Sequence, residues 1–538
     1  MNEYRTHNCG ELNEKNIGSE VKLSGWVQKI RNLGGMVFID LRDQFGITQI
    51  VVSSEEMQNK VKEITTESSV CISGKVVERA SKNPNLSTGS IEVVANSIEI
   101  LGKCKNVLPF EVNTDQEVRE DLRLEYRFLD LRNEKLHNNI MLRSKILKTL
   151  RDKMDELGFA EIQTPILANS SPEGARDFLV PSRLHPGEFY QLDFEMAYST
   201  QEDVFKILEE VVPYTFKKFT NWKVDEGEFI RIPYREAMEK YGIDKPDLRN
   251  PLIIQDVTKV FEHSEFKAFA GKTVKAIVVE NGAEQGRKFF DKMTDFAVEE
   301  AGAKGLAWVK FEQDGNVQGG IAKFINEEMQ KELVENYGVK PNSSIFFIGD
   351  EFETAQKIAG LVRIELGKRL DLIEKNVYKF CWIVDFPMYE LSDEGKIDFC
   401  HNPFSMPQGG MEALEKMEPL DILAYQYDLV CNGYEMASGA VRNHNPEIMV
   451  KAFEIAGYEE EEIKNRFGAL YNAFQYGTPP HAGAAPGVDR MVMLITDSQN
   501  IREIIAFPKN KKARDLLMRA PSRVMEEQLK DVHIKIEE

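Results

Sequence analysis

Five short runs of β-branched and apolar residues within the first hundred positions constrain the fold more than any other feature of this chain. Clusters of Gly, Asn and Ser separate them, and one run with helical character, residues 54–65, interrupts the series. Five strands with one interposed helix predict an OB barrel. Another small β-barrel would show the same number of strands, so the count alone leaves that alternative open. The runs are VKLSGWVQKI, MVFIDLRD, ITQIVVSS, SSVCISGKVVERA and SIEVVANSIEIL.

The rest of the chain divides into further segments. The spacing of apolar residues predicts a helix over 135–157 that ends at Gly158, followed by a strand at 159–167. Strands are also predicted within 378–406, and a helix across 424–439. Strands and helices alternate inside the stretch 251–375, which interrupts a larger domain and is therefore predicted to be an inserted α+β domain. We expect an α+β multidomain chain made of a barrel domain (1–105), a linker (106–134), the first part of a larger domain (135–250), the insertion (251–375) and the second part of the larger domain (376–538).

Composition excludes several classes of protein. No stretch approaches ~18 consecutive apolar residues, so no membrane span is expected, and the polar N-terminus has no signal-peptide core. The six cysteines occur singly rather than as C-x-x-C pairs, which favours a cytoplasmic protein. A net charge of −20 argues against a polyanionic partner, but residues 1–110 hold 13 basic and 13 acidic side chains. The N-terminal end would therefore repel a nucleic acid least.

Two common nucleotide-binding signatures are missing from the sequence. The segment FAGKTVK has Phe266 where a P-loop needs its first glycine, and no G-x-G-x-x-G follows a strand. The most distinctive run is Tyr476–Thr496, YGTPPHAGAAPGVDRMVMLIT. Its small residues permit close backbone approach, and Arg490 at the start of an apolar helix can pair with a phosphate. Taken alone, Gly487–Arg490 is more simply a helix start with an exposed arginine.

Two further stretches place acids in a suggestive pattern. Asp428 and Glu435 are seven residues apart and can share one face of a helix or extended segment. Hard oxygen ligands of this kind suit Mg²⁺ that arrives with ATP phosphates, although two solvated acids are the plainer interpretation. The loop Ser171–Pro181 contains Glu173, for which a capping carboxylate in a turn is the plainer interpretation.

Together these stretches resemble the bacterial-type aspartyl-tRNA synthetases, a family of class II aminoacyl-tRNA synthetases. The resemblance runs nearly end to end and includes the inserted domain. It implies an OB-fold anticodon-binding domain, a class II catalytic domain built on an antiparallel sheet, and a homodimer that uses motif 1. The segments that carry it are SPEGARDFLVPSR, DKPDLRNP, HNPFSMP, NGYEMASGAVR, YGTPPHAGAAPGVDR and IREIIAFPK, with GFAEIQTPIL as motif 1 and GWVQKIRNLGGMVFIDLRDQFGITQIV in the barrel.

The resemblance implies a two-step reaction. L-aspartate attacks the α-phosphate of ATP to give aspartyl-adenylate, and the aspartyl group then passes to the 3′ end of tRNA-Asp. Arg442 would grip the side-chain carboxylate of aspartate as a bidentate fork, and a neutral amide would leave this buried arginine unpaired. The other implied roles are aspartate binding by Glu173, Asp193 and His401, ATP binding by Glu435, Gly487, Val488, Asp489 and Arg490, Mg²⁺ binding by Asp428 and Glu435, and catalysis by Glu435 and Arg490.

The resemblance also assigns roles in tRNA binding to the barrel. Phe38 would stack on an anticodon base, Gln49 would bond the central U, and Glu92 lies on a later strand. Considered alone, a phenylalanine in a strand is more often a core residue. A histidine in the loop at Leu33 accompanies family members that also charge tRNA-Asn, and here Leu33 and Lys82 resemble the strict form.

The family pattern breaks after Tyr190, which runs directly into Gln191. The resemblance implies several tens of residues at this point, including a QSPQ-type loop, a lysine and motif 2. The motif 2 arginine binds the α-phosphate, and loss of one such donor costs ~10²–10³ in rate. We therefore expect an impaired enzyme whose central sheet lacks two strands.

Three alternatives remain open from the sequence. An asparaginyl or lysyl synthetase would share the barrel and motifs 1 and 3, but the insertion and Arg442 argue against it. A non-catalytic tRNA-binding paralogue is favoured by the gap, whereas the intact Glu435 and Arg490 argue against long decay. A stand-alone OB-fold binder explains only about the first hundred residues.

Overall fold

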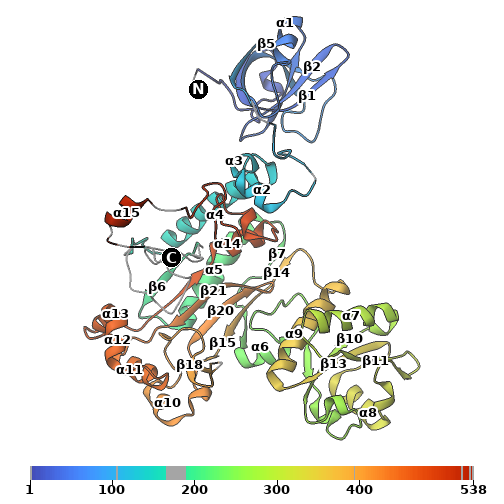
Figure 1. Cartoon of the computed structure of the whole chain (residues 1–538), viewed down its shortest axis with the longest axis vertical. Coiled ribbons are helices and arrows are strands. Elements are labelled where there is room, and N and C mark those ends of the chain that lie inside the picture. Colours follow the sequence, from blue (N-terminus) through green and yellow to red (C-terminus); the bar gives the residue numbers. More distant parts are fainter. Residues whose placement is uncertain are drawn as a thin grey trace. The chain divides into compact units, whose positions relative to one another are not determined.

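The computed structural model describes residues 3–104, 107–114, 116–164, 190–392, 394–522, 525–531, 533 and 535. The chain divides into two compact units, Met1–Ile140 with Ala506–Glu538, and Met141–Ile505. Figure 1 shows the chain coloured from blue at the N-terminus to red at the C-terminus. The C-terminal segment Ala506–Glu538 thus groups with the first unit, although we expected it in the second part of the larger domain. Within the described residues, no helix is both long enough and apolar enough to cross a membrane.

The first unit contains the closed five-stranded barrel that the sequence predicts. Strand order around the barrel is β1-β2-β3-β5-β4, and the short helix lies between β3 and β4. Alternate side chains point inward, so Val37, Ile39 and Leu41 of β2 lie in the core. The elements are β1 (Glu20–Leu33), β2 (Met36–Arg42), β3 (Ile47–Val52), α1 (Glu55–Val61), β4 (Ser69–Glu78) and β5 (Ile91–Gly102), followed by α2 (Glu120–Glu125) and α3 (Arg127–Asp130), with α15 (Glu526–Asp531) near the C-terminus.

A buried acid joins the barrel to the segment after α3. Glu67 accepts hydrogen bonds from Arg42 at 2.9 Å and from Arg132 at 3.0 Å. Arg132 also lies over the ring of Trp26, 4.5 Å from its centroid. Glu67 and Arg42 are both buried, so the pair is shielded from water and removal of either partner would be costly.

The second unit is built on a six-stranded sheet in the order β6-β22-β21-β20-β15-β8. All neighbours run antiparallel except β15 and β8. In the described part of the chain β6 is an edge strand. The strands are β6 (Phe194–Ala197), β8 (Ile230–Pro233), β15 (Phe380–Val384), β20 (Gln426–Cys431), β21 (Tyr434–Val441) and β22 (His481–Pro486).

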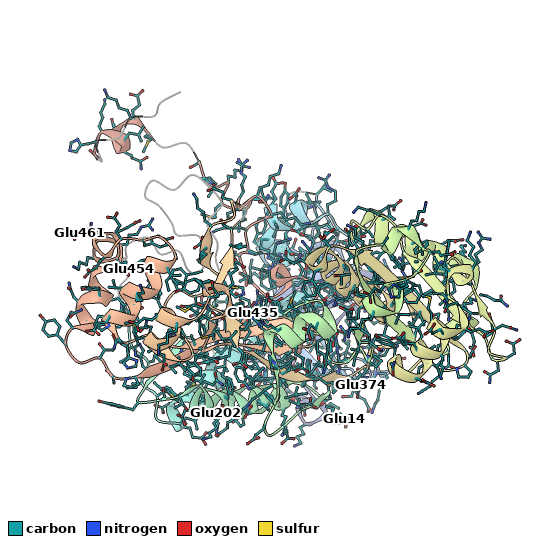
Figure 2. The ribbon with its side chains drawn as sticks, turned by 90° about the horizontal axis from the view of Figure 1, so that it is seen from below. Glu14, Glu202, Glu374, Glu435, Glu454 and Glu461 are labelled. Carbon is teal, nitrogen blue, oxygen red and sulfur yellow. The ribbon has the colours of Figure 1, made fainter. Side chains whose placement is uncertain are left out.

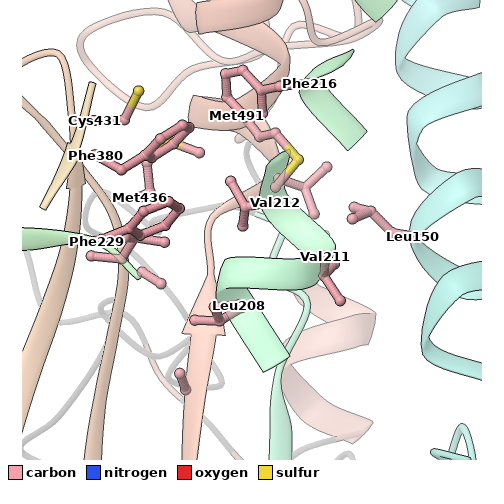
Figure 3. Packing of buried hydrophobic residues seen from close by; sticks show 14 of the residues in the cluster. Leu150, Leu208, Val211, Val212, Phe216, Phe229, Phe380, Cys431, Met436 and Met491 are labelled. Carbon is pink, nitrogen blue, oxygen red and sulfur yellow. The ribbon is translucent and has the colours of Figure 1, made fainter. Parts of the chain in front are cut away.

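Three helices pack against this sheet around the largest apolar cluster of the second unit. They are α4 (Glu134–Glu156), α5 (Gln201–Phe219) and α14 (Val488–Ile495). Figure 3 shows Leu208, Val212 and Phe216 of α5 directed toward Phe380 and Met436 of the sheet. The predicted helix over 135–157 is therefore confirmed, and Gly158, at φ +87°, follows its end.

The insertion has a sheet and apolar clusters of its own. The strand order is β12-β11-β13-β10-β9, and successive residues of β10 alternate between two clusters. Ile277 and Val279 pack with α7 and α9, whereas Val274 and Ala276 pack with α8. The elements are β9 (Ile254–Asp256), β10 (Thr273–Val279), α7 (Arg287–Glu299), β11 (Ala307–Phe311), β12 (Val317–Gln318), α8 (Glu327–Tyr337), β13 (Ser343–Asp350) and α9 (Phe352–Arg369).

Smaller elements complete the second unit. Helix α6 (Tyr234–Tyr241) leads into the insertion, and four short helices lie between or beside the late strands of the sheet. These are α10 (Gly410–Lys416), α11 (Pro446–Ile455), α12 (Glu460–Arg466) and α13 (Gly468–Phe474), and the short strands are β7 (Lys223–Val224), β14 (Val377–Tyr378), β16 (Phe386–Pro387), β17 (Tyr389–Leu391), β18 (Ile397–Phe399) and β19 (Leu423–Ala424).

Two predictions of secondary structure differ from the structure. The helix predicted across 424–439 is wrong, because this segment forms the hairpin β20–β21. Asn432 and Gly433 have φ of 52° and 86°, the left-handed values of a two-residue hairpin turn. Residues 159–164 form no strand, and the rest of the strand predicted at 159–167 lies outside the described residues.

Candidate functional site

The hairpin β20–β21 carries two acids on neighbouring strands. Asp428 is buried, with 5% of its surface exposed, and its Oδ1 has no hydrogen-bond partner. Burial, and next the charge of Glu435, raise the pKa of Asp428 to about 7. A buried carboxylate oxygen without a partner beside a second acid is a site that favours a cation.

Glu435 is held between two basic side chains, and Figure 2 shows its place among the side chains of the ribbon. Its Oε1 lies 3.2 Å from Nη1 of Arg490, and its Oε2 lies 3.3 Å from Nζ of Lys245. Arg490 also donates to the Glu435 carbonyl at 2.6 Å. Burial alone would lower the pKa of Lys245, but Asp244, Glu435 and Asp428 together raise it, so the ammonium is charged.

The two acids fit a hard divalent cation only when other oxygens complete its shell. No group of three or more His, Cys, Asp or Glu side chains in the described segments could hold a metal. Asp428 and Glu435 supply two carboxylates, fewer than the six oxygens that Mg²⁺ requires. The phosphates of a nucleotide and water are the usual source of the rest.

The run Tyr476–Thr496 places β22 beside β21 and starts α14. A side chain at Gly439 or Gly483 would collide with backbone of the neighbouring strand, so close strand approach explains the small residues. Gly487 is the N-cap residue of α14, and Val488 is buried. Only Arg490 of the predicted ATP-binding segment has a largely exposed side chain, at 46%.

Asp489 has a different local role from the one expected. Its buried carboxylate pairs with Arg143 and accepts a hydrogen bond from the backbone of Tyr190 at 3.0 Å. The Tyr190 carbonyl in turn accepts from Val488 at 2.8 Å. Asp489 therefore anchors the point at which the chain passes from Tyr190 to Gln191, and its part in ATP binding stays a prediction.

Arg442 follows β21 and faces Glu195 of β6 and Asp193, which precedes that strand. Its Nε and Nη2 donate to Oε1 of Glu195 at 3.0 and 2.6 Å. Asp193 is accessible to solvent, but the surrounding protein and then Glu195 raise its pKa, whereas Arg442 lowers it. The Arg442 side chain is 20% exposed, so it is partly rather than fully shielded from water.

The other two residues implied in aspartate binding are His401, which the structure describes, and Glu173, which it does not. His401 is exposed, and its ring packs edge-on against Phe386 at 5.3 Å. The loop that follows His401 returns beside Arg442 through a bridge between Ser405 and Arg442. Glu173 lies outside the described residues.

A polar network covers part of the outer face of the barrel. Gln49 donates to Glu92 at 2.7 Å and accepts from Arg79 at 2.8 Å and Arg31 at 3.2 Å. Phe38 is half-buried on β2 and lies on the opposite side of the strand from the core residues Val37 and Ile39. The interpretation of Phe38 as a core residue is therefore wrong, and the strand presents its ring outward.

The remaining barrel residues with predicted roles lie in exposed segments. Leu33 ends β1 next to the turn at Gly34 and Gly35, with 61% of its surface exposed. Lys82 is exposed and pairs with Glu78 at 3.1 Å and Glu14 at 3.3 Å. Neither contact tests their predicted part in tRNA selection.

Four side chains at these sites were missed by the sequence reasoning. Arg31 and Arg79 join the network around Gln49, Glu195 pairs with Arg442, and Lys245 pairs with Glu435. A signal existed for Glu195, because residues two apart on a strand share a face and Asp193 was already implicated. Lys245 lies in the segment DKPDLRNP, which carries part of the resemblance, but nothing in that segment pointed to Glu435 as its partner.

Comparisons with known proteins cover nearly the whole chain. Residues 21–101 match the model of the OB-fold nucleic acid binding domain, and residues 119–190 and 182–511 match the model of class II tRNA synthetases (D, K and N). The chain is 51% identical to an aspartate–tRNA ligase of Streptomyces coelicolor and 50% identical to an aspartate–tRNA(Asp/Asn) ligase of Rickettsia bellii. These matches cover all of this chain and 99% and 98% of the relatives.

Solved structures share the fold. An asparaginyl-tRNA synthetase from Pyrococcus horikoshii superposes with a TM-score of 0.54 at 18% identity, covering 94% of this chain and 98% of that one. An aspartyl-tRNA synthetase from Entamoeba histolytica gives 0.55 at 17%, covering 93% and 90%. At these identities the likeness extends to the fold alone.

Two features of the comparisons bear on the break after Tyr190. The alignment with the Streptomyces relative spans 583 positions, 45 more than the 538 residues of this chain. The synthetase model matches in two pieces that share residues 182–190. A short segment that matches both sides of a break is expected where two similar sequence stretches have been joined, and this break coincides with Tyr190.

Proposed function

The chain belongs to the aspartate–tRNA ligases among the class II tRNA synthetases, and from this membership we propose that it activates L-aspartate with ATP and transfers it to tRNA-Asp. The observation that supports the proposal most is the joint placement of Asp428, Glu435 and Arg490. A buried carboxylate with one unpartnered oxygen and a second acid lie on one hairpin, and an exposed guanidinium at the start of the next helix lies beside the second acid.

The side chains divide the reaction among themselves. Asp428 and Glu435 would hold Mg²⁺, which would neutralise charge on the ATP phosphates. Arg490 binds the terminal phosphate, while Arg442 and Asp193 bind the two ends of aspartate. No protein nucleophile is needed, because positioning and charge stabilisation carry the chemistry.

The selectivity for aspartate rests on Arg442. In the present structure Glu195 provides the carboxylate oxygen that Arg442 binds at 2.6 Å. The carboxylate of the substrate takes the place of that oxygen, whereas the amide of asparagine offers an NH₂ group to an obligate donor. Arg442 to lysine would lose the bidentate geometry and reduce discrimination.

The absence of the motif 2 segment after Tyr190 would lower the rate of the reaction without changing which amino acid is activated. The resemblance places the motif 2 arginine in this stretch, and its loss removes one preorganised donor to the α-phosphate. We infer that adenylate formation by this chain is slower by ~10²–10³ than in an uninterrupted relative.

ATP–pyrophosphate exchange with aspartate and with asparagine tests the proposal. We expect slow exchange with aspartate and none with asparagine, and faster exchange once the missing residues are inserted between Tyr190 and Gln191. Exchange with asparagine would contradict the aspartate assignment. If neither the chain nor its repaired form shows exchange, the chain is a tRNA-binding paralogue without catalysis.

The proposal extends to the choice of tRNA, the cellular compartment and the oligomeric state. Leu33 and Lys82 favour charging of tRNA-Asp over tRNA-Asn, and the ratio of aminoacylation rates for the two tRNAs checks this. A cytoplasmic homodimer accords with the six free thiols and with the resemblance to motif 1. Sedimentation of the chain, compared with the repaired form, tests whether the dimer survives the gap.

A further inference from the structure

Lys245 lies beside Glu435, one of the two acids proposed to bind the metal ion. The proposed reaction assigns it no role. It belongs to the loop between α6 and β9, and its Nζ is 3.3 Å from Glu435 and 2.8 Å from Asp244. The side chain is about one-third exposed, at 31%, and Glu435 is one-quarter exposed, at 25%. The ammonium thus occupies a partly desolvated position next to the acid that would bind a cation.

The insertion holds the loop that carries Lys245. Arg363 of α9 is fully buried and donates to the carbonyls of Leu252 at 2.6 Å, Asn250 at 2.9 Å and Asp247 at 3.2 Å. The Asn250 amide donates back to the Arg363 carbonyl at 3.0 Å. One guanidinium therefore fixes three carbonyls within a few residues of Lys245.

A close backbone contact adds to this clamp. Gly242 at the end of α6 approaches Gly360 of α9 so tightly that a Cβ on Gly242 would lie 2.5 Å from the Gly360 Cα. Gln356 of α9 also donates to the carbonyls of Met238 and Glu239 in α6. The two ends of the loop are thus attached to α9, and movement of α9 would move Lys245.

We propose that Lys245 is a positioning residue that serves as the resident counter-cation of the Asp428–Glu435 pair, and that α9 of the insertion sets its position. The inference rests on the proposed function, because it assigns Lys245 a task at the same metal-binding acids. A fixed ammonium competes with a free divalent cation for Glu435, so the pair binds metal well only when a nucleotide brings further ligands. The insertion then adjusts metal occupancy from outside the sheet.

Arg490 is the other cation on Glu435, and its effect must be separated from that of Lys245. Arg490 sits on the opposite carboxylate oxygen and is more exposed, at 46%. Screening by water weakens its competition with a metal ion. Lys245, which Asp244 holds in place, is the stronger competitor.

Binding of Mn²⁺ alone to the full chain, measured by electron paramagnetic resonance without nucleotide, tests the proposal. We expect Lys245→Met to tighten Mn²⁺ binding about tenfold, and Lys245→Arg to restore the weak binding by replacing the charge. Lys272→Met is the matched control, because Lys272 is 29% exposed and pairs with two acids of the insertion, Asp350 and Glu351. Equal Mn²⁺ affinity in the wild-type chain and Lys245→Met would overturn the proposal.

A double-mutant comparison tests the part played by α9. We expect Arg363→Lys, which keeps the charge but loses the three-carbonyl clamp, to tighten Mn²⁺ binding by a few-fold in the wild-type chain and to have no effect beside Lys245→Met. An equal effect in both backgrounds would overturn the clamp. Asn250→Ala removes the reciprocal hydrogen bond and replaces Arg363→Lys if that variant does not fold.

The metal titration is independent of the ligase reaction. ATP–pyrophosphate exchange reports the proposed function, and Mn²⁺ affinity reports the role of Lys245. If the chain catalyses ATP–pyrophosphate exchange but the wild-type chain and Lys245→Met bind Mn²⁺ equally, only the role of Lys245 is refuted. If the two differ in Mn²⁺ affinity but the repaired chain catalyses no exchange, only the proposed ligase activity is refuted.

Discussion

The barrel and the six-stranded sheet of the second unit respond differently to loss of sequence. The barrel is closed, and its five strands are consecutive within residues 20–102, so all its contacts come from one short stretch. The sheet collects strands from segments between 194 and 486, and β6, the first strand after the gap, stands at its edge in the described part of the chain. A closed local fold is insulated from a deletion elsewhere, whereas an open composite sheet loses its substrate-binding partners directly.

The two polar sites repeat this contrast. On the barrel, Gln49 has its partners Glu92, Arg79 and Arg31 all from the same domain. In the second unit, Arg442 pairs with Glu195 on the first strand after the break. We therefore expect tRNA binding by the barrel to be complete and amino-acid activation to be impaired.

Repair of the gap gives the largest expected effect. Insertion of the missing positions of the Streptomyces relative between Tyr190 and Gln191 should raise the rate of ATP–pyrophosphate exchange by ~10²–10³, because it returns one preorganised donor to the α-phosphate. The same insertion with its motif 2 arginine replaced by alanine is the control and should gain little. An equal gain from both insertions would mean that the segment acts through stability and not through charge.

The barrel could be predicted and the hairpin β20–β21 could not, for a physical reason. The half-buried strands of the barrel alternate between core and surface, as β2 does at Val37, Phe38 and Ile39. Every residue of β20 is buried, so its sequence has no alternation and resembles a buried helix. The turn residues Asn432 and Gly433 are the sequence feature that distinguishes a hairpin from a buried helix here.

Local sequence also fails to predict which charged side chains contact Glu435. Asp428, Glu435 and Arg490 were named from motifs, and the structure brings Glu435 and Arg490 together at 3.2 Å. Lys245 reaches Glu435 only because α6 and α9 fold the intervening loop against the sheet. Such a contact depends on long-range packing, which local sequence does not report.

Removal of the buried acid in the barrel should give the next largest effect. Glu67→Gln leaves Arg42 and Arg132 without their counter-charge, and we expect the barrel to lose ~3 kcal/mol of stability. Amide hydrogen exchange in the full chain checks this, with faster exchange expected in β1–β5 but not in the insertion. Glu78→Gln, which breaks only the exposed pair with Lys82, is the control and should leave exchange in β1–β5 nearly unchanged.

A smaller effect is expected from the outer face of the barrel that we propose binds the anticodon. Phe38→Ala should weaken tRNA-Asp binding by ~1–3 kcal/mol through loss of base stacking. Phe45→Ala, in an exposed loop of the same domain, should leave the affinity unchanged. Filter binding or fluorescence titration measures both. The loss of tRNA affinity should be the same in the repaired chain. A loss that changes with the repair would show that the barrel does not function independently of the sheet.

The two hairpin turns allow the finest comparison. Gly433 in β20–β21 and Gly34 in β1–β2 both have positive φ, 86° and 60°, and neither has an atom closer than 3.4 Å to a substituted Cβ. Substitution of either by alanine should therefore cost ~1 kcal/mol from backbone strain alone. The consequences should differ, because Gly433→Ala shifts Asp428 and Glu435 and should weaken Mn²⁺ binding, whereas Gly34→Ala should change only the stability of the barrel. Equal Mn²⁺ affinity in the two variants would show that the hairpin tolerates the strain without moving its acids.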